Sequence, residues 1–372
     1  MTDAAAPDRI VTDRVVAALA TVVDPELRQP ITDLDMVGEV SVDDSCDPAV
    51  AHVGIRLTIV GCPAADRIER DTVAAIERAG FVADVTVTVM SKAERDALIQ
   101  KLRGGRPKTL QFGPDSLTRI YAITSGKGGV GKSTITANLG VALAASGLRV
   151  GIVDADVFGF SIPGILGIEG AEPTRVDDMI LPPIAYDARV ISIGMFLPEG
   201  ASAVSWRGPM LHRTIQQFLT DVYFGDLDIL LLDLPPGTGD VAISIGQLLP
   251  QAEVIVVTTP QRAAAVVAER SAIVARQTGQ RVIGVIENMA GGIFGEGGGA
   301  AVVSRLTTDD QPVSLLASIP LSEPLREGGD AGRPLVVANP TDPAAQAIRS
   351  VADALAHRPR GLSGRKLPIS VD

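Results

Sequence analysis

A glycine-rich run with two lysines is the part of the sequence best equipped for chemistry. Nine consecutive residues form it: Gly126, Lys127, Gly128, Gly129, Val130, Gly131, Lys132, Ser133 and Thr134. Glycines leave backbone N–H groups free to curl around phosphate oxygens, and a helix that begins at the end of the run points its positive end at the same anion. The pattern G-x-x-x-x-G-K-[ST] therefore predicts a phosphate-binding loop, in which Lys132 reaches the β- and γ-phosphates and the Ser133 hydroxyl ligates Mg²⁺.

The segments on either side of this run support the same prediction. Residues 119–124 form an apolar stretch typical of a buried strand, and residues 135–145 continue as a helix-like segment. Strand, glycine-rich turn and helix in that order are the surroundings that a phosphate-binding loop (P-loop) requires. We therefore expect the chain to bind a nucleoside triphosphate together with Mg²⁺.

A second lysine, Lys127, stands at the second position of the loop, where a side chain points away from the phosphates held by its own loop. In ATPases that sandwich nucleotide between two subunits, such a lysine crosses the interface and neutralises charge that develops during phosphoryl transfer. An ordinary exposed lysine is the alternative, because lysines are common at protein surfaces. The first interpretation predicts that hydrolysis requires a homodimer.

Acidic residues follow two further apolar runs. Asp154 and Asp156 come after residues 150–153, and Asp233 comes after residues 229–232. In a doubly wound sheet, ligands bind at the carboxyl ends of the strands. We expect Asp233 and Asp156 to serve the Mg²⁺ site and Asp156 also to orient or activate the attacking water, whereas Asp154 bonds backbone near the loop. Taken singly, each aspartate has a helix cap or a turn as its alternative role.

Two further segments complete the expected site. Asp233 opens the run Asp-Leu-Pro-Pro-Gly-Thr-Gly-Asp, where prolines fix φ and glycines permit positive φ. Such a loop can move between two defined positions when the γ-phosphate is lost. Asn288 follows the apolar run 282–286, and its amide offers a donor and an acceptor that match an adenine edge. A turn is the alternative role for Asn288.

These side chains need a framework of buried strands. From residue 117 onward, short apolar runs alternate with helical patterns. This alternation predicts an α/β fold with a doubly wound, mostly parallel sheet, the fold of a P-loop NTPase. Residues 1–100 are expected to form a small α+β domain in front of it. Residues 101–116 have the composition of a linker, residues 117–357 form the nucleotide-binding domain, and residues 358–372 are expected to be a flexible tail.

The composition argues against several classes of function. A net charge of −11 argues against a nucleic-acid surface, because such a surface needs clustered Lys and Arg. No apolar run approaches the length of a membrane span, and the first residues lack the basic-then-apolar order of a signal peptide. Two cysteines exclude a disulfide framework. We expect a cytoplasmic protein that binds neither nucleic acid nor membrane.

Several motifs together resemble the Mrp-type iron–sulfur cluster carrier ATPases, which belong to the wider class with deviant Walker A loops. The motifs are residues 126–134, Asp-Ala-Asp-Val-Phe-Gly-Phe-Ser-Ile-Pro from Asp154, Trp-Arg-Gly-Pro-Met-Leu-His from Trp206, and Asp-Leu-Pro-Pro-Gly-Thr-Gly-Asp from Asp233. The match extends through residues 287–289 and 319–329, so it covers most of residues 117–340. The N-terminal part resembles the MIP18-like domain through Asp-Pro-Glu-Leu from Asp24, Asp-Leu-Asp-Met-Val from Asp33 and Gly-Cys-Pro from Gly61.

The resemblance implies a homodimer that binds ATP and Mg²⁺, hydrolyses ATP slowly, receives an iron–sulfur cluster and passes it to apo client proteins. It also implies Lys127 as the lysine that acts across the dimer, Lys132 as the phosphate-binding lysine, Asp156 and Asp233 as switch acids, and Asn288 as part of the base pocket.

The chain departs from the family pattern at one point. Many members carry a Cys-x-x-Cys pair after the Glu-Asn-Met segment, and two such pairs across the dimer hold a [4Fe–4S] cluster, whereas residues 287–299 here contain no cysteine. Cys62 is the remaining candidate ligand, because it precedes Pro63 and a predicted helix whose N-terminus would lower the pKa of the thiol. A small buried apolar residue is the alternative for Cys62. Cys46, in a polar turn, is expected to be incidental.

Three functions are compatible with these observations. The leading one is an ATP-hydrolysing carrier or assembly factor for iron–sulfur clusters. The alternative is an ATP-gated protein-interaction switch without a cluster, because the family's cysteine pair is absent. A membrane-positioning ATPase ranks last, since residues 359–372 show no amphipathic helical stripe.

Overall fold

The chain divides into two compact units in the computed structural model, which describes residues 7–104, 111–113, 116–197 and 208–358. Unit 1 comprises Met1–Leu110, Glu172–Pro183 and Leu219–Gly225, and unit 2 comprises Gln111–Ala171, Ile184–Phe218 and Asp226–Asp372. The predicted tail after Arg358, half of the predicted linker (105–110 and 114–115) and Trp206 lie outside the described residues.

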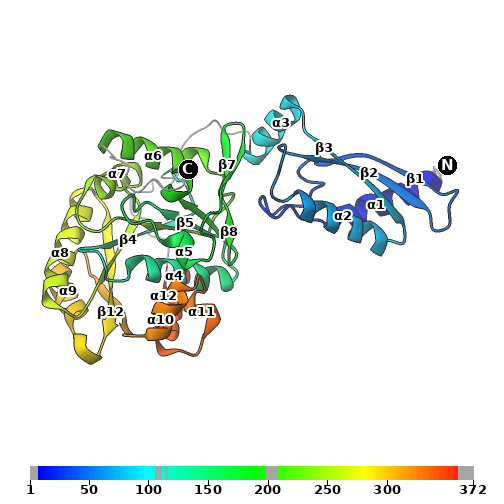
Figure 1. Ribbon diagram of the computed structural model, residues 1–372. Coiled ribbons are helices and arrows are strands. Elements are labelled where there is room, and N and C mark those ends of the chain that lie inside the picture. The colour runs from blue at the N-terminus through cyan, green and yellow to red at the C-terminus, as the bar shows by residue number, and fades with distance from the viewer. Residues whose placement is uncertain (1–6, 105–110, 114–115, 198–207, 359–372) are drawn as a thin grey trace, which may run out of the picture. The chain divides into compact units, whose positions relative to one another are not determined.

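Unit 1 is built on a three-stranded sheet in the order β1-β2-β3. Its N-terminal elements are α1 (Pro7–Leu19), β1 (Val37–Asp43), β2 (Val50–Leu57), α2 (Ala65–Arg78), β3 (Val82–Val89) and α3 (Lys92–Leu102). β1 and β2 are antiparallel, whereas β2 and β3 are parallel because α2 provides the crossover between them. Alternate residues of β2 are buried, Val53 and Ile55 among them, and α1 and α2 pack against this sheet (Figure 1).

A later part of the chain completes unit 1. Strands β6 (Thr174–Val176) and β7 (Met179–Leu181) form an antiparallel hairpin, and Ile180 makes a single bridge to Val222. Val176, Met179 and Leu181 are buried in the same hydrophobic cluster as the side chains of β2, α1 and α2. The compact unit around the N-terminal sheet therefore includes segments more than 70 residues beyond its sequence boundary near residue 100.

Unit 2 contains an eight-stranded sheet in the order β13-β12-β11-β4-β10-β5-β9-β8. Its strands are β4 (Arg119–Ser125), β5 (Val150–Asp154), β8 (Ile184–Ala185), β9 (Ala188–Ser192), β10 (Ile229–Asp233), β11 (Glu253–Thr258), β12 (Arg281–Ala290) and β13 (Ser314–Pro320). β8 runs antiparallel to β9, and the other neighbouring pairs are parallel. The predicted doubly wound, mostly parallel α/β fold is confirmed.

Helices surround the sheet of unit 2 (Figure 1). They are α4 (Lys132–Ala145), α5 (Ile162–Ile165), α6 (Gly208–Asp221), α7 (Asp240–Leu248), α8 (Arg262–Gln277), α9 (Gly298–Leu306), α10 (Glu323–Asp330), α11 (Leu335–Ala338) and α12 (Pro343–Ala356), with short 3₁₀ turns at Ile193–Phe196 and Gly292–Phe294. The boundary between the units crosses α6 after Phe218. α4 packs against α12, and α8 packs against α7 and α9.

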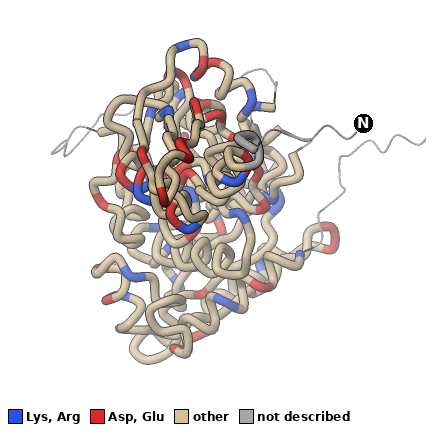
Figure 2. The backbone as a smooth tube through the Cα atoms, turned by 90° about the vertical axis from the view of Figure 1, so that its right-hand side faces the viewer, with Lys and Arg blue, Asp and Glu red and all other residues tan. Residues whose placement is uncertain are grey.

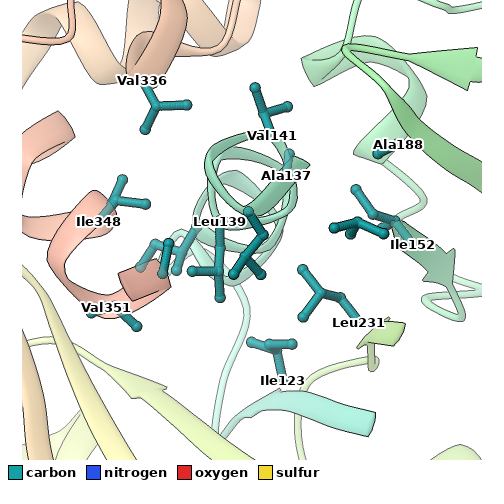
Figure 3. Packing of buried hydrophobic residues seen from close by; sticks show 14 of the residues in the cluster. Ile123, Ala137, Leu139, Val141, Ile152, Ala188, Leu231, Val336, Ile348 and Val351 are labelled. Atoms are coloured by element: carbon teal, nitrogen blue, oxygen red, sulfur yellow. The ribbon is translucent and has the colours of Figure 1, made fainter. Parts of the chain in front are cut away.

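The core of unit 2 forms where α4 lies on the central strands (Figure 3). Leu139 on α4 faces Ile123, Leu231 and Ile348, which come from two strands and α12. α4 approaches the sheet closely at Gly140, where an added Cβ would lie 2.5 Å from Ile152. This packing fixes the N-terminus of α4 relative to the ends of the strands.

The register of the central strands brings the predicted acids together. Asp233 at the end of β10 pairs with Asp154 of β5 on one side and with Ile123 of β4 on the other. All residues of β5 and β10 are buried, as expected for parallel strands covered on both faces.

Figure 2 shows basic and acidic residues interspersed along the backbone.

Candidate nucleotide-binding site

The glycine-rich loop connects the end of β4 to the first residue of α4, as predicted. Gly131 adopts a φ of 82°, and an added Cβ there would lie 2.3 Å from the Asn288 amide nitrogen. Gly126 lies so close to α8 that an added Cβ would be 2.3 Å from the backbone of Val267. The two glycines are therefore required by backbone conformation and by close packing.

A cavity of about 680 Å³ opens beside this loop. Its walls come from the loop and the start of α4, from the segment after β5, from α6, and from the segment after β10. The lining includes Lys127, Gly129, Lys132, Ser133, Asp156, Phe158, Leu211, Pro235, Pro236 and Asp240. The N-terminus of α4 also borders the cavity, so backbone N–H groups and the helix dipole favour an anion there.

Lys132 is the central cation of the site and is only 6% exposed. Its Nζ lies 2.6 Å from Asp233 Oδ2, 3.6 Å from Asp156 Oδ2 and 3.1 Å from Ser133 Oγ. Ser133 donates a hydrogen bond of 2.6 Å to the same oxygen of Asp233. The four predicted residues thus form one contiguous cluster, in which a buried lysine compensates buried carboxylates.

Thr136 belongs to this cluster but was missed by sequence reasoning. Its hydroxyl donates to Asp233 Oδ1 at 2.8 Å and is also within hydrogen-bond distance of the Lys132 carbonyl. The signal available in the sequence was its position one helical turn after Lys132, on the same face of α4. Through Thr136, Ser133 and Lys132, both oxygens of the fully buried Asp233 are satisfied.

Asp156 lies in the loop after β5 and is nearly buried. Its Oδ1 accepts backbone hydrogen bonds from Phe158 and Gly159 at 3.3 and 3.1 Å. Burial raises the pKa of the Asp156 carboxyl, and the positive charge of Lys132 opposes that rise. The carboxyl is therefore close to the phosphate-binding lysine and is more basic than an exposed aspartate.

Asp154 holds the loop that carries Asp156. Its Oδ1 accepts from the Asp156 N–H, and its Oδ2 accepts from the Ile162 N–H and from the Ser192 hydroxyl, each at 3.1 to 3.2 Å. Burial and the neighbouring Asp233 raise the pKa of Asp154. This arrangement agrees with the expected backbone-binding role, while Ser192, its partner on β9, was not anticipated.

Lys127 stands apart from the carboxylate cluster. Its Nζ donates to Gln261 Oε1 at 3.2 Å, at the N-cap of α8. The described residues place no carboxylate within ion-pair distance of Lys127, so its charge is not neutralised in the way that the charge of Lys132 is.

Asn288 lies against the P-loop from the end of β12. Its Nδ2 donates to the Val130 carbonyl at 2.9 Å, and the residue is 3% exposed. Its Oδ1 is buried and has no hydrogen-bond partner within the part of the chain that the structure describes. A buried acceptor without a partner costs free energy, and Asn288 is not among the described residues that line the cavity beside the P-loop.

Cys62 lies in unit 1, between β2 and α2. The thiol is 6% exposed, and its Sγ lies 3.8 Å from Glu26 Oε2. Burial, together with the negative charges of Glu26 and Asp24, raises the pKa of Cys62 to about 11. The expectation that the N-terminus of α2 lowers this pKa is therefore wrong, because desolvation outweighs the one favourable backbone hydrogen bond.

The described residues also show no metal-ligand geometry around Cys62. Within residues 7–104, 111–113, 116–197 and 208–358, no group of three His, Cys, Asp or Glu side chains is arranged to hold a metal ion. Cys46 is exposed and Cys62 is buried, and both thiols are free.

The described helices include none that is long and apolar enough to cross a membrane.

These features define a P-loop NTPase of the ParA-like class. The glycine-rich loop joins a parallel strand to a helix, and the first residue of that helix is a lysine. The aspartate at the end of a neighbouring strand accepts a hydrogen bond from the Ser133 hydroxyl. Residues 116–356 match the family described as NUBPL iron-transfer P-loop NTPase, and residues 12–89 match the family described as iron–sulfur cluster assembly protein. The chain belongs to the NUBPL-type iron-transfer P-loop NTPase family. This membership confirms the resemblance drawn from the motifs.

Relatives with known names cover nearly the whole chain. An iron–sulfur cluster carrier protein of Mycobacterium tuberculosis is 53% identical over 366 residues, which are 95% of each chain. A protein of the same name from Deinococcus radiodurans is 39% identical over 355 residues, covering 92% of this chain and 94% of the relative.

Two solved structures resemble the nucleotide-binding part. A nucleotide-binding protein from Archaeoglobus fulgidus in complex with ADP has a TM-score of 0.50 and 35% identity, covering 58% of this chain and 86% of the other. The septum site-determining protein MinD from Pyrococcus horikoshii, complexed with Mg-ADP, has a TM-score of 0.50 and 28% identity, covering 68% of this chain and 100% of the other.

Proposed function

We propose that this protein is a cytoplasmic, Mg²⁺-dependent ATPase that carries iron–sulfur clusters to apo client proteins. The observation that carries the proposal is the cluster of Lys132, Ser133, Asp156 and Asp233 beside the P-loop, in a chain 53% identical to a named iron–sulfur cluster carrier protein. Nucleotide-bound relatives support the first half of the proposal, and the named carriers support the second.

Phosphate binding follows from the loop and Lys132. A triphosphate offers oxygens to the loop N–H groups and to Lys132 Nζ, which exchanges part of its contact with Asp233 for contacts to phosphate. The exchange keeps the buried ammonium paired throughout, which limits the cost of desolvation. The geometry therefore favours binding of the β- and γ-phosphates at Lys132.

The oxygen donors around Lys132 suit Mg²⁺, which prefers carboxylate, hydroxyl and water oxygens. Ser133 and Asp233 would hold the ion, with Asp156 nearby, and the ion would neutralise charge on the phosphate oxygens. Asp156 accepts or orients a proton of the attacking water, because its carboxyl lies beside Lys132 and burial raises its pKa. Asp154 and Ser192 keep the Asp156 loop in place.

Lys127 provides the argument for a homodimer. Its ammonium is held by the neutral Gln261 side chain rather than by a carboxylate. Two copies facing each other through their P-loops would let each Lys127 approach the nucleotide of the partner, where it would neutralise developing charge. Hydrolysis then requires two subunits.

Asn288 supports ATP as the nucleotide. Its buried Oδ1 has no partner among the described residues, and the exocyclic amine of adenine is a donor that would satisfy it. Guanine presents a carbonyl at the corresponding position, so the same atom would disfavour GTP.

The iron–sulfur cluster is the cargo of the protein, and Cys62 is the candidate thiol that would receive this cluster. Soft thiolates are the ligands that iron–sulfur clusters require, and the family's cysteine pair is missing from residues 287–299. Because Cys62 is buried with a raised pKa, the thiol must become uncovered before it binds iron.

Two lysine variants test the ATPase. Lys132→Ala should weaken ATP binding at least about a hundredfold, whereas Lys127→Ala should spare binding and lower kcat by roughly 10³-fold. Binding is measured by isothermal titration and turnover by phosphate release. Normal turnover of Lys127→Ala would reject its action across a dimer.

Iron content tests the carrier function. We expect iron and sulfide to bind in stoichiometric amounts during anaerobic reconstitution and to be lost in Cys62→Ala but retained in the matched variant Cys46→Ala. Persistent absence of iron from the wild-type protein would favour an ATP-gated interaction switch instead.

A further inference from the structure

The hairpin of residues 172–183 has the features of a docking surface. One face is apolar, with Val176, Met179 and Leu181 each at most 2% exposed. Its two-residue tip is acidic, because Asp177 and Asp178 join β6 to β7. Asp177 adopts a φ of 53°, a conformation that aspartate tolerates better than most residues. An apolar face beside an acidic tip requires a partner with an apolar surface and adjacent basic residues.

The N-terminal part of the chain is that partner. Arg95 on α3 forms an ion pair of 3.0 Å with Asp177, and Arg103 at the end of α3 forms one of 3.2 Å with Asp178. Both arginine side chains are about one-fifth exposed, at 21% and 18%. The apolar face of the hairpin joins the hydrophobic cluster that contains the buried residues of β2 and α2.

The contacts of the hairpin extend to the only buried thiol among the described residues. Thr174 donates a hydrogen bond of 2.5 Å to Glu26 Oε1, while the other oxygen of Glu26 lies 3.8 Å from Cys62 Sγ. Burial raises the pKa of Glu26, and the Thr174 hydrogen bond opposes that rise. A single carboxyl group therefore connects the hairpin to Cys62.

We infer that the 172–183 hairpin is a cover for Cys62, docked on the N-terminal domain by two ion pairs, and that the thiol reacts only when the hairpin leaves. The inference goes beyond the proposed function and does not depend on ATP hydrolysis. In the docked state, Val176, Met179 and Leu181 complete the hydrophobic cluster that contains Cys62, and Thr174 holds Glu26 against the thiol. In the undocked state, solvent and reagents reach the Cys62 thiol.

The two cysteines allow a direct test with iodoacetamide in the full-length protein. Cys46 is exposed and provides an internal reference, whereas Cys62 is buried. Rates of alkylation at each site are measured by mass spectrometry at fixed pH, without nucleotide. We expect the double reversal Arg95→Glu/Arg103→Glu to raise the Cys62 rate by about tenfold while leaving the Cys46 rate unchanged, because two ion pairs become repulsive contacts.

A matched control lies on the same helix. Lys101 on α3 pairs with Asp35 rather than with the hairpin. Lys101→Glu therefore reverses one charge on α3, as each arginine reversal does, without altering an ion pair to the hairpin. We expect its Cys62 rate to match that of the wild type. Adding Asp177→Arg and Asp178→Arg to the double reversal restores both ion pairs with exchanged signs and should return the Cys62 rate toward the wild-type value.

Two results would overturn the inference. One is a Cys62 rate in the double reversal that equals the rate in Lys101→Glu. The other is an increase that the exchanged-charge variant does not reduce, since the exposure would then have arisen elsewhere. Neither result bears on nucleotide binding, so the ATPase proposal is tested separately.

Discussion

Both units bury carboxylates, but they satisfy them differently. In unit 2, Asp233 meets the ammonium of Lys132 and two hydroxyls. In unit 1, the buried Asp24 and the half-buried Glu26 lie near Cys62, and the hydrogen bonds that they accept come from backbone N–H groups, a hydroxyl and a thiol. Burial accordingly raises the pKa of both Asp24 and Glu26.

The difference lies in whether a buried carboxyl group has a cationic partner, as Asp233 does in unit 2. A buried ion pair near a P-loop is costly to assemble but can be exchanged for the charges of phosphate and metal. Burial raises the pKa of Asp24 and Glu26, and the negative charge of these carboxyl groups discourages ionisation of the neighbouring Cys62 thiol. The nucleotide site thus carries a cation that can meet an anionic ligand, whereas Cys62 is buried and its pKa is raised.

Removing the loop carboxylate of unit 2 should have the largest effect. Asp156→Asn keeps the hydrogen-bonding shape but removes the proton acceptor, so kcat should fall by about 10²- to 10⁴-fold while ATP binding is largely retained. Phosphate release and isothermal titration measure the two quantities. A variant with unchanged kcat would show that Asp156 belongs to the loop scaffold rather than to the chemistry.

Matched threonine variants sharpen the comparison between the two units. Thr136→Val removes a donor from Asp233, which is paired with Lys132, and should cost about 1.5–3 kcal/mol locally. Thr174→Val removes a donor from the half-buried Glu26 and should cost about 0.5–1.5 kcal/mol. Native-state hydrogen exchange followed by mass spectrometry reports each unit separately. Equal costs at the two sites would contradict the contrast between a carboxyl group paired with a lysine and one that has no cationic partner among the described residues.

A further prediction concerns pH and needs no variant. Because the pKa of Cys62 is raised to about 11, its thiolate fraction is low at neutral pH and increases as pH rises toward that value. In the wild-type protein, the alkylation rate of Cys62 should therefore rise about tenfold per pH unit between roughly pH 8 and 10. A rate that reaches its plateau below pH 9 would show that the thiol is less buried than the structure indicates.

Much of the nucleotide site could be predicted because its residues follow local rules. The glycine pattern specifies the loop, and the apolar runs before Asp154 and Asp233 specify strands whose carboxyl ends meet at one edge. Thr136 and Ser192 escaped prediction because an isolated Thr or Ser has no distinguishing local signal. Thr136 meets an aspartate 97 residues away, and Ser192 meets one 38 residues away.

The surroundings of Cys62 show the opposite case. Its place before a helix suggested a lowered pKa, but the structure buries the thiol beside two carboxyl groups and raises the pKa. The hairpin that contributes to this burial reaches Glu26 across 148 residues of sequence. Such a contact depends on which surfaces pack together, and periodicity within a segment carries no information about it.

By itself, the sequence determined the P-loop, the order of strands and helices in unit 2, the acids at the strand ends and the family, because backbone sterics and hydrophobic periodicity act over short stretches of chain. Only the tertiary structure decided that Lys132 is paired with Asp233, that Asn288 Oδ1 finds no partner among the described residues, and that the 172–183 hairpin belongs with Cys62. These features depend on burial and on contacts between distant segments, and burial is what turns a carboxylate, an amide or a thiol into a group with altered chemistry.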